Sequence, residues 1–406
     1  MKILRVRALE ILDSRGNPTV QAEVLLADGT RACAQVPSGA STGRHEAVEL
    51  RDGGARYQGK GVLQAVRNVE SVLGPAVVGL LASDQGFIDQ RLTETDGSEG
   101  KRRLGANATL AVSCAVARAA ALSLRMPLWK YLAGGRAATM PVPMVNMISG
   151  GLHAGRNIEF QDFMVIPQGY PDLASALEAV VRVHGAVGRL AGERGCVLTG
   201  VADEGGWGPR LARNEDAAVI LREAIEVAGA TMDIALDVAA THFWRDGEYA
   251  LEGGGLSAFE MGEMLQGWVG RYGITSIEDP LAEDDWAGWK ALTERLGGSV
   301  RLVGDDLFVT DLKRLERGIR EGVANAVLVK MNQIGTLTET FAVIDRAREA
   351  GYGAVISARS GETEDSFLSD LVVGSGAGQI KVGSVVRSER LAKYNRLLEI
   401  EKWELL

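Results

Sequence analysis

Five short apolar segments in the second part of the chain end in a charged residue. Four follow one another along the sequence, "IALD", "SIE", "LVGD" and "VLVK", and the fifth is "QIK". For any single segment, a solvated residue at the end of a strand is a sufficient explanation. For all five together that explanation is weak, because charges beside buried strands are costly unless they meet partners. The residues are Asp237, Glu278, Asp305, Lys330 and Lys381.

Three carboxylates in a chain with only four histidines favour a hard cation with oxygen ligands, and Mg²⁺ is the natural candidate. A lysine beside such a cation has its charged form disfavoured, so its pKa falls and it can act as a base. Base and metal together indicate removal of a proton α to a carboxylate, with the metal holding the developing enediolate. The pairing of a lysine base with Mg²⁺ is known from the enolase superfamily, and it is that precedent which suggests the pairing here.

The elements that must position these residues are short strands alternating with amphipathic helices. Eight such strands favour a closed β/α barrel over an open doubly wound sheet, and in a parallel barrel the carboxyl ends of the strands meet at one face. A segment at 197–202 is either a ninth strand or the start of a loop, and periodicity does not decide between them. The eight strands are expected at 143–146, 163–166, 234–237, 275–278, 302–305, 327–330, 354–357 and 379–381.

The first 125 residues have a different pattern. Two β-like runs between Thr19 and Pro37 are joined at Asp28-Gly29, which is a two-residue hairpin signal. Helical spacing of apolar residues follows at 62–81 and 106–124. The fold class is therefore α/β, with an N-terminal α+β capping domain at 1–125 and a β/α, TIM-like barrel domain at 140–406.

Composition excludes several classes of protein. The 406 residues contain 44 Lys and Arg against 53 Asp and Glu, a net charge of −9, and no basic run of the kind that binds nucleic acid. The three scattered cysteines indicate neither a disulfide framework nor a zinc site. No signal sequence is evident, and no stretch is expected to span a membrane. We expect a cytoplasmic protein whose partner is a small molecule.

Seven stretches resemble the enolase family, and together they extend over nearly the whole chain. The family has an N-terminal capping domain and a barrel whose second strand is antiparallel, and its "DEGG" segment lies in a loop between two helices. The resemblance therefore implies a loop for the ambiguous segment at 197–202. The matching stretches are "EILDSRGNPTV", "PSGASTG", "DEGG", "SIEDP", "GDDLFVT", "NQIGTLTET" and "RSGETED".

The resemblance implies two Mg²⁺ ions in each active site. Asp237, Glu278 and Asp305 match the ligands of the first ion. Ser41, in the "SGASTG" loop, matches the ligand that closes over the second ion and the substrate phosphate. A flexible surface loop is the alternative explanation for Ser41. The family also implies a homodimer or a higher homo-oligomer.

The remaining roles also come from the resemblance. Lys330 matches the base, Glu204 the acid that helps the C3 hydroxyl leave, and Lys381 the lysine that faces the substrate carboxylate. Arg359 and Ser360 match the phosphate donors, while Gln161 and His153 line the same pocket. The alternative for His153 is a strand-end histidine with a purely structural partner, and its position in "GGLHAG" favours the functional interpretation.

Three departures from the family pattern stand out. Asp162 replaces the glutamate of "QEF", Ala358 replaces the histidine of "SHRSGE", and the chain ends soon after its last predicted helix. Shortening the carboxylate by one methylene is expected to disturb an acid relay that depends on hydrogen-bond reach. Loss of the histidine removes a donor beside the phosphate and the leaving hydroxyl. Enolate formation should persist while substrate choice or the leaving-group step changes.

Three functions are consistent with this pattern. The preferred one is a specialised relative that makes or uses a phosphoenolpyruvate-like compound, as the enolase-like carboxyphosphonoenolpyruvate synthases of phosphonate antibiotic pathways do. The second is an ordinary enolase that interconverts 2-phosphoglycerate and phosphoenolpyruvate. The third, a non-catalytic binding protein on the same scaffold, is disfavoured because a binding module has no need of two lysines and three carboxylates in one cluster.

Overall fold

The computed structural model describes residues 1–40 and 43–405. The chain begins with an antiparallel sheet of β1 (Ile3–Leu12), β2 (Pro18–Leu26) and β3 (Arg31–Gln35) in that order. The predicted hairpin at Asp28-Gly29 joins β2 to β3, and β2 alternates between buried and partly exposed residues as a strand on a one-sided core should. No strand was predicted at the position of β1. Most of its residues are at least partly exposed, and the exposed ones include the apolar Leu4, Leu9 and Leu12, so the strand shows no regular alternation of apolar and polar residues.

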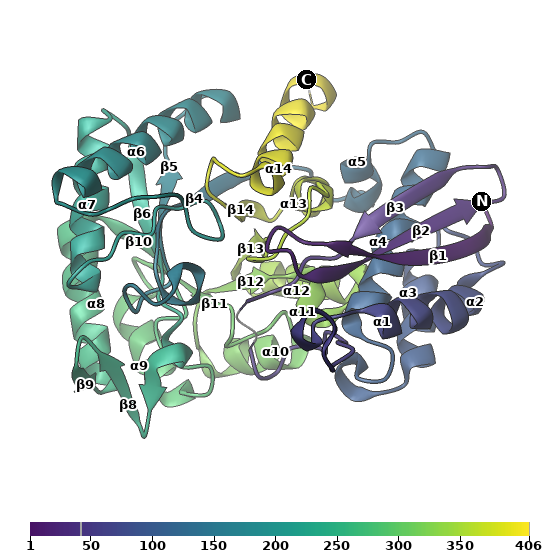
Figure 1. The fold of residues 1–406 in the computed structure, drawn as a ribbon, viewed down its shortest axis with the longest axis horizontal. Coiled ribbons are helices and arrows are strands. Elements are labelled where there is room, and N and C mark those ends of the chain that lie inside the picture. Colours follow the sequence, from purple (N-terminus) through teal and green to yellow (C-terminus); the bar gives the residue numbers. More distant parts are fainter. Residues whose placement is uncertain (41–42, 406) are drawn as a thin grey trace.

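Helices cover one side of this sheet and complete the N-terminal unit, at the right of Figure 1. The helix predicted at 62–81 is interrupted: α1 (Leu63–Asn68) passes into a π-helical turn (Val69–Leu73) and then α2 (Gly74–Val77). Pro75 has no N–H to donate to the preceding turn, so the α-helical bonding pattern cannot continue there. The other helices are α3 (Gln85–Asp96), α4 (Ala106–Ser123) and α5 (Leu128–Ala133).

Helix α4 has the length and apolar composition of a membrane span, contrary to the expectation from sequence. However, 83% of its 18-residue window is buried inside the fold, where it packs against β2 and β3. A helix that is apolar on all its faces can also be a buried helix in the core of a folded protein, and the small alanine side chains let it pack closely against the sheet.

The predicted barrel is present, and all eight expected strands belong to it. Its order is β10-β11-β12-β13-β14-β4-β5-β6, closed by pairing of β6 with β10. Pairing is parallel throughout except that β5 runs antiparallel to β4 and β6, as the family resemblance implies. The strands are β4 (Val142–Ser149), β5 (Asp162–Pro167), β6 (Met232–Asp237), β10 (Ile274–Glu278), β11 (Arg301–Gly304), β12 (Ala326–Val329), β13 (Gly353–Ser357) and β14 (Gly378–Gly383).

Apolar side chains from alternate strand positions fill the barrel, among them Met144, Met164 and Leu328, so its interior is a packed core. Segment 197–202 contains no strand and lies in the loop between α6 and α7, with "DEGG" further along the same loop. The barrel helices are α6 (Leu173–Glu193), α7 (Asn214–Val227), α8 (Ala258–Tyr272), α9 (Trp286–Leu296), α10 (Leu312–Glu321), α11 (Met331–Ile334), α12 (Leu337–Glu349), α13 (Phe367–Ser375) and α14 (Ser388–Glu399).

A small sheet of β7 (Trp244–Arg245), β8 (Glu248–Leu251) and β9 (Gly254–Leu256) follows β6 on the outside of the barrel. On the opposite side, the N-terminal unit meets the barrel at its carboxyl-terminal face. There, Ser38 and Gly361 exchange backbone hydrogen bonds of 2.7 and 2.9 Å. The chain just after β3, at Ser38, therefore lies against the face where the charged strand ends meet.

Candidate active site

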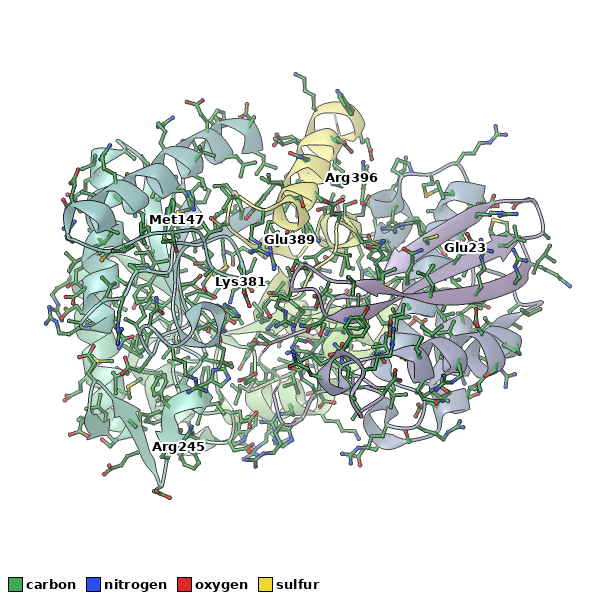
Figure 2. The ribbon with its side chains drawn as sticks, in the orientation of Figure 1. Glu23, Met147, Arg245, Lys381, Glu389 and Arg396 are labelled. Atoms are coloured by element: carbon green, nitrogen blue, oxygen red, sulfur yellow. The ribbon has the colours of Figure 1, made fainter. Side chains whose placement is uncertain are left out.

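The five charged strand-end residues meet in one buried cluster at the carboxyl ends of the strands. Lys381, on barrel strand β14, is labelled near the middle of the molecule in Figure 2. Its Nζ donates to Asp237 Oδ2 and Glu278 Oε2, each at 2.7 Å. Lys330 Nζ donates to Asp305 Oδ2. All five side chains are buried, so their charges are compensated by one another and not by water.

The pKa values in this cluster follow from burial and from the neighbouring charges. Burial and the Asp237 carboxylate raise the pKa of Glu278 well above its usual value. For Asp237, burial opposes ionisation, but Lys381 outweighs it and lowers the pKa to about 2. Burial alone would lower the pKa of Lys330, but Asp305 and Glu278 reverse the direction and raise it. The carboxylates of the protein thus favour the protonated form of Lys330, opposite to the shift expected beside a bound dication.

The residues present fit a divalent metal ion. Glu278 Oε1 and Gln161 Oε1 are buried and have no hydrogen-bond partner in the described part of the chain, and such atoms are costly unless they bind something. Gln161 also donates to Asp237 Oδ2 at 3.1 Å, so it helps to orient that carboxylate. Unpartnered carboxylate and amide oxygens on a wall of further carboxylates suit Mg²⁺.

A second acidic group, formed by Asp279, Asp305 and Asp306, has oxygens that lie within 4.8 Å of one another. No role was predicted for Asp279 or Asp306, although both directly follow a predicted ligand. Asp279 accepts the backbone N–H groups of Asp305 and Asp306, at 3.0 and 2.7 Å. Its carboxylate therefore fixes the backbone that carries Asp305.

His153 connects two carboxylates beside the charged cluster. Its Nδ1 lies 2.9 Å from Asp162 Oδ2, and its Nε2 lies 3.7 Å from Glu204 Oε1. The other oxygen of Asp162 accepts from Asn146 Nδ2 and from Ser149 Oγ. The shorter side chain of Asp162 therefore still contacts the histidine, and the longer gap in this relay is the one between His153 and Glu204.

The local backbone that presents His153 requires its two preceding glycines. A Cβ at Gly150 would lie 2.3 Å from the carbonyl oxygen of Phe160, and Gly151 has a φ of +47°. The chain then forms a single 3₁₀ turn, Gly151–Ala154, which directs the imidazole toward Asp162 at the start of β5. Only residues without a side chain can make so close an approach.

Arg359 and Ser360, predicted as phosphate donors, lie in the loop after β13 and contact the N-terminal unit. The Arg359 guanidinium pairs with Glu46 at 3.0 Å and also donates to Asn332 Oδ1 at 2.9 Å. Ser360 Oγ accepts the backbone N–H of Ala40 at 2.7 Å. Glu46 and Asn332 were missed by the sequence analysis, although Asn332 opens the quoted "NQIG" stretch. Ser41, the predicted ligand of the second ion, lies outside the described residues.

Ala358 lies in the same loop, between Ser357 and Arg359. Its backbone N–H donates to the carbonyl oxygen of Lys381 at 2.8 Å, and the residue is only 6% exposed. Its methyl group belongs to the main apolar cluster, which extends through both the N-terminal unit and the barrel domain. Residue 358 therefore lies beside strand β14, which carries Lys381, and in the same loop as Arg359 and Ser360.

A barrel closed at its carboxyl-terminal face by a separate α+β unit, with buried lysines and carboxylates at the junction, defines a class of capped β/α-barrel enzymes. The family model described as the enolase N-terminal domain matches residues 3–132. The model described as the enolase C-terminal TIM barrel domain matches residues 137–405. The chain belongs to the enolase family, and it is an enolase-superfamily lyase.

The His153 relay gives a testable pH dependence. Burial lowers the pKa of His153, but Asp162 and Glu204 together raise it to about 9 from an ordinary value of 6.5. A group whose pKa is raised by folding stabilises the folded state fully below its unfolded pKa, and that stabilisation is lost as pH rises through the folded pKa. We expect the free energy of unfolding to fall by roughly 2 to 4 kcal/mol between about pH 6.5 and 9 because of this residue. Denaturant unfolding of wild type and His153→Gln at several pH values measures the difference. If the free energy of unfolding fell equally with pH in the two proteins, the raised pKa would not belong to His153.

Proposed function

We propose that this protein removes the proton α to the carboxylate of 2-phosphoglycerate, or of a closely related phosphorylated carboxylate, and forms a phosphoenolpyruvate-type product. The observation that carries the proposal is the burial of Lys330 among three carboxylates at the mouth of a barrel of the enolase family. Asp237, Glu278 and Asp305 would hold Mg²⁺. When bound, Mg²⁺ would stabilise the charge developing on the substrate carboxylate and lower the pKa of Lys330.

The residues of the chain divide the remaining work. Lys330 takes the proton, and Lys381, held between two carboxylates, faces the carboxylate of the substrate. Glu204 gives a proton to the leaving hydroxyl, supported by its neighbour His153. Burial alone would raise the pKa of Glu204, but His153 and the neighbouring cations lower it, and Glu204 in turn raises the pKa of His153. The imidazole beside the acid therefore holds the proton of this pair more readily than the carboxylate does.

We further propose that the chain is a specialised member of the family, such as a carboxyphosphonoenolpyruvate synthase. The support is that Ala358 and Asp162 both change the side of the site that handles the phosphate and the leaving group. Ala358 offers a methyl group beside Arg359 where the family has an imidazole, and we propose that a larger anionic group takes the volume that the imidazole has in the family. A carboxyphosphono group is a phosphoryl in which a carboxylate replaces one oxygen, so it keeps the contacts to arginine and adds bulk.

An ordinary enolase is the second candidate. It is favoured by the contact that Asp162 keeps with His153, because that contact leaves the acid relay connected despite the shorter side chain. A non-catalytic binding protein has no such support. Burial of five charged groups lowers the stability of the fold, and a binding module has no need of such a cluster.

A comparison of the substrates that are turned over by wild type and by the double variant Ala358→His with Asp162→Glu distinguishes these two candidates. For a specialised enzyme, we expect wild type to turn over 2-phosphoglycerate poorly alone and to form a new product when CMP-phosphonoformate is present. The double variant should gain turnover of 2-phosphoglycerate. Phosphoenolpyruvate is followed by its absorbance and the phosphonate product by ³¹P NMR. Wild-type turnover of 2-phosphoglycerate at roughly 10 to 10³ s⁻¹, with the activated phosphonate ignored, would establish the ordinary enolase.

A further inference from the structure

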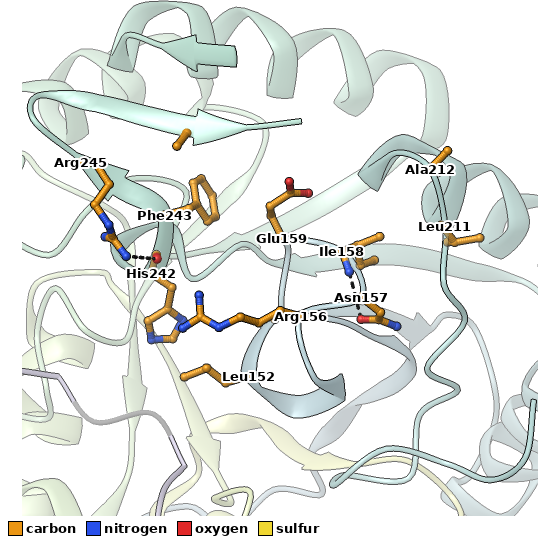
Figure 3. Close-up of a pocket in the computed structure, with 12 residues that line it drawn as sticks. Leu152, Arg156, Asn157, Ile158, Glu159, Leu211, Ala212, His242, Phe243 and Arg245 are labelled. Atoms are coloured by element: carbon orange, nitrogen blue, oxygen red, sulfur yellow. Dashed lines mark hydrogen bonds between the residues drawn. The ribbon is translucent and has the colours of Figure 1, made fainter. Parts of the chain in front are cut away.

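A cavity of about 370 Å³ lies beside the barrel mouth, separate from the lysine and carboxylate cluster (Figure 3). Its size is within the range of pockets that hold small organic ligands. It is formed by three segments that are distant in the sequence: the loop after β4 at 151–159, residues 211–212 before α7, and the segment at 242–250 that includes the β7–β8 hairpin. Neither the sequence motifs nor the proposed reaction assigns it a role.

One end of this pocket is cationic. Figure 3 shows Arg156, His242 and Arg245 grouped together on one side. Among the described residues, Arg245 donates only to backbone carbonyls, those of Trp244 at 2.6 Å and His242 at 3.0 Å. In the part of the chain that the structure describes, the guanidinium groups of Arg156 and Arg245 form no ion pair. Two guanidinium groups without a carboxylate partner therefore line the same pocket.

One carboxylate, that of Glu159, also lines the pocket, but its hydrogen bonds are made elsewhere. Its Oε2 accepts from Asn214 Nδ2 at 2.7 Å, and its Oε1 accepts from the backbone N–H of Glu252 at 3.1 Å. In Figure 3 its carboxylate is directed away from the Arg156 guanidinium. The carboxylate thus leaves the two arginines uncompensated.

The other end of the pocket is apolar. Ile158, Leu211 and Ala212 line the side opposite the arginines (Figure 3). A ligand that fits must therefore carry negative charge at one end and a carbon skeleton or ring at the other. Two guanidinium groups with free donors match the several oxygens of a phosphate group better than a single carboxylate does.

The pocket adjoins the reaction centre. Leu152, on its wall, directly precedes His153, and His242 is five residues beyond Asp237. Burial lowers the pKa of His242, and the charges of Asp237 and Arg156 both act on it, in opposite directions. His242 thus lines the pocket and also feels the charge of a carboxylate of the main site.

We propose that this pocket binds an organic phosphate monoester larger than 2-phosphoglycerate, with its phosphate at Arg156 and Arg245 and its organic part against Ile158 and Leu211. Nucleoside monophosphates and sugar phosphates share this chemistry. The site serves a second substrate or an effector, and its existence does not depend on which reaction Lys330 performs.

Calorimetric titration of the Lys330→Ala protein, with Mg²⁺ and saturating 2-phosphoglycerate, tests the proposal without turnover. The probes are CMP, AMP, ribose 5-phosphate and inorganic phosphate. We expect at least one organic phosphate to bind more tightly than inorganic phosphate. Adding Arg156→Ala or Arg245→Ala should weaken it about 10- to 100-fold, as loss of a charge-assisted hydrogen bond would. If CMP and AMP bind but ribose 5-phosphate does not, the pocket is a nucleotide site. If ribose 5-phosphate binds as well, the pocket is a sugar phosphate site.

Arg125→Ala is the matched control. Arg125 is also exposed and has a φ of +55°, close to the +61° of Arg156, so the two substitutions meet the same backbone constraint. It lies in the N-terminal unit, and its variant should bind like the parent. Equal affinity in the Arg156→Ala and Arg125→Ala proteins would overturn the proposal, as would failure of every organic phosphate to bind. Because binding is read without catalysis, an inactive main site and an empty pocket give different results.

Discussion

Replacement of Lys330 by alanine is expected to abolish exchange of the substrate α-proton with solvent. A positioned general base contributes about 10²- to 10⁴-fold, so the rate should fall by at least that factor. The only other lysine in the charged cluster is Lys381, and its ammonium is held by Asp237 and Glu278, which raise its pKa well above the usual value despite burial. It cannot readily replace Lys330 as a base. Exchange is measured by ¹H NMR in deuterated buffer with 2-phosphoglycerate and Mg²⁺.

Glu204→Gln is the matched variant for this experiment. Glu204 belongs to the step in which the hydroxyl leaves, so its amide variant should still exchange the α-proton while net product formation stops. Both variants keep the barrel core intact, and thermal unfolding of each confirms that it is folded. Exchange at the wild-type rate in Lys330→Ala would show that another group is the base.

Removal of a metal ligand is expected to have an effect of similar size. Asp237, Glu278 and Asp305 should bind Mg²⁺ at about 2.0–2.1 Å, so Glu278→Gln and Asp305→Ala should each lose activity and the response to the ion. A ligand at 100 times its dissociation constant stabilises the folded state by about 2.7 kcal/mol, which corresponds to several degrees in the melting temperature. We expect Mg²⁺ to raise the melting temperature of wild type and of neither variant.

The comparison uses the shift caused by Mg²⁺ and not the melting temperature itself. Asp305→Ala leaves the Lys330 ammonium buried without its carboxylate, which by itself is expected to cost about 3–5 kcal/mol. Glu294→Gln, on the exposed side of α9, removes a carboxylate with no link to the site and should keep the full shift. Full activity of Asp305→Ala in the presence of a chelator would end the interpretation of this cluster as a metal site.

The sequence by itself determined the barrel and its reactive face. Each barrel strand is a short apolar run because its two sides are buried, and parallel strands bring their carboxyl ends together. Local periodicity and the position of Asp237, Glu278 and Lys330 at those ends were therefore enough to place them in one cluster. The antiparallel direction of β5 came from the family resemblance, because periodicity gives the position of a strand but not its direction.

Only the tertiary structure decided which charges meet. Arg359 pairs with Glu46 across 313 residues of sequence, and Lys381 donates to the carboxylates of both Asp237 and Glu278. The cationic pocket at Arg156 and Arg245 is likewise assembled from segments that share no motif. Contacts of this kind depend on how loops of irregular conformation fold over the barrel, and no hydrophobic period records that path.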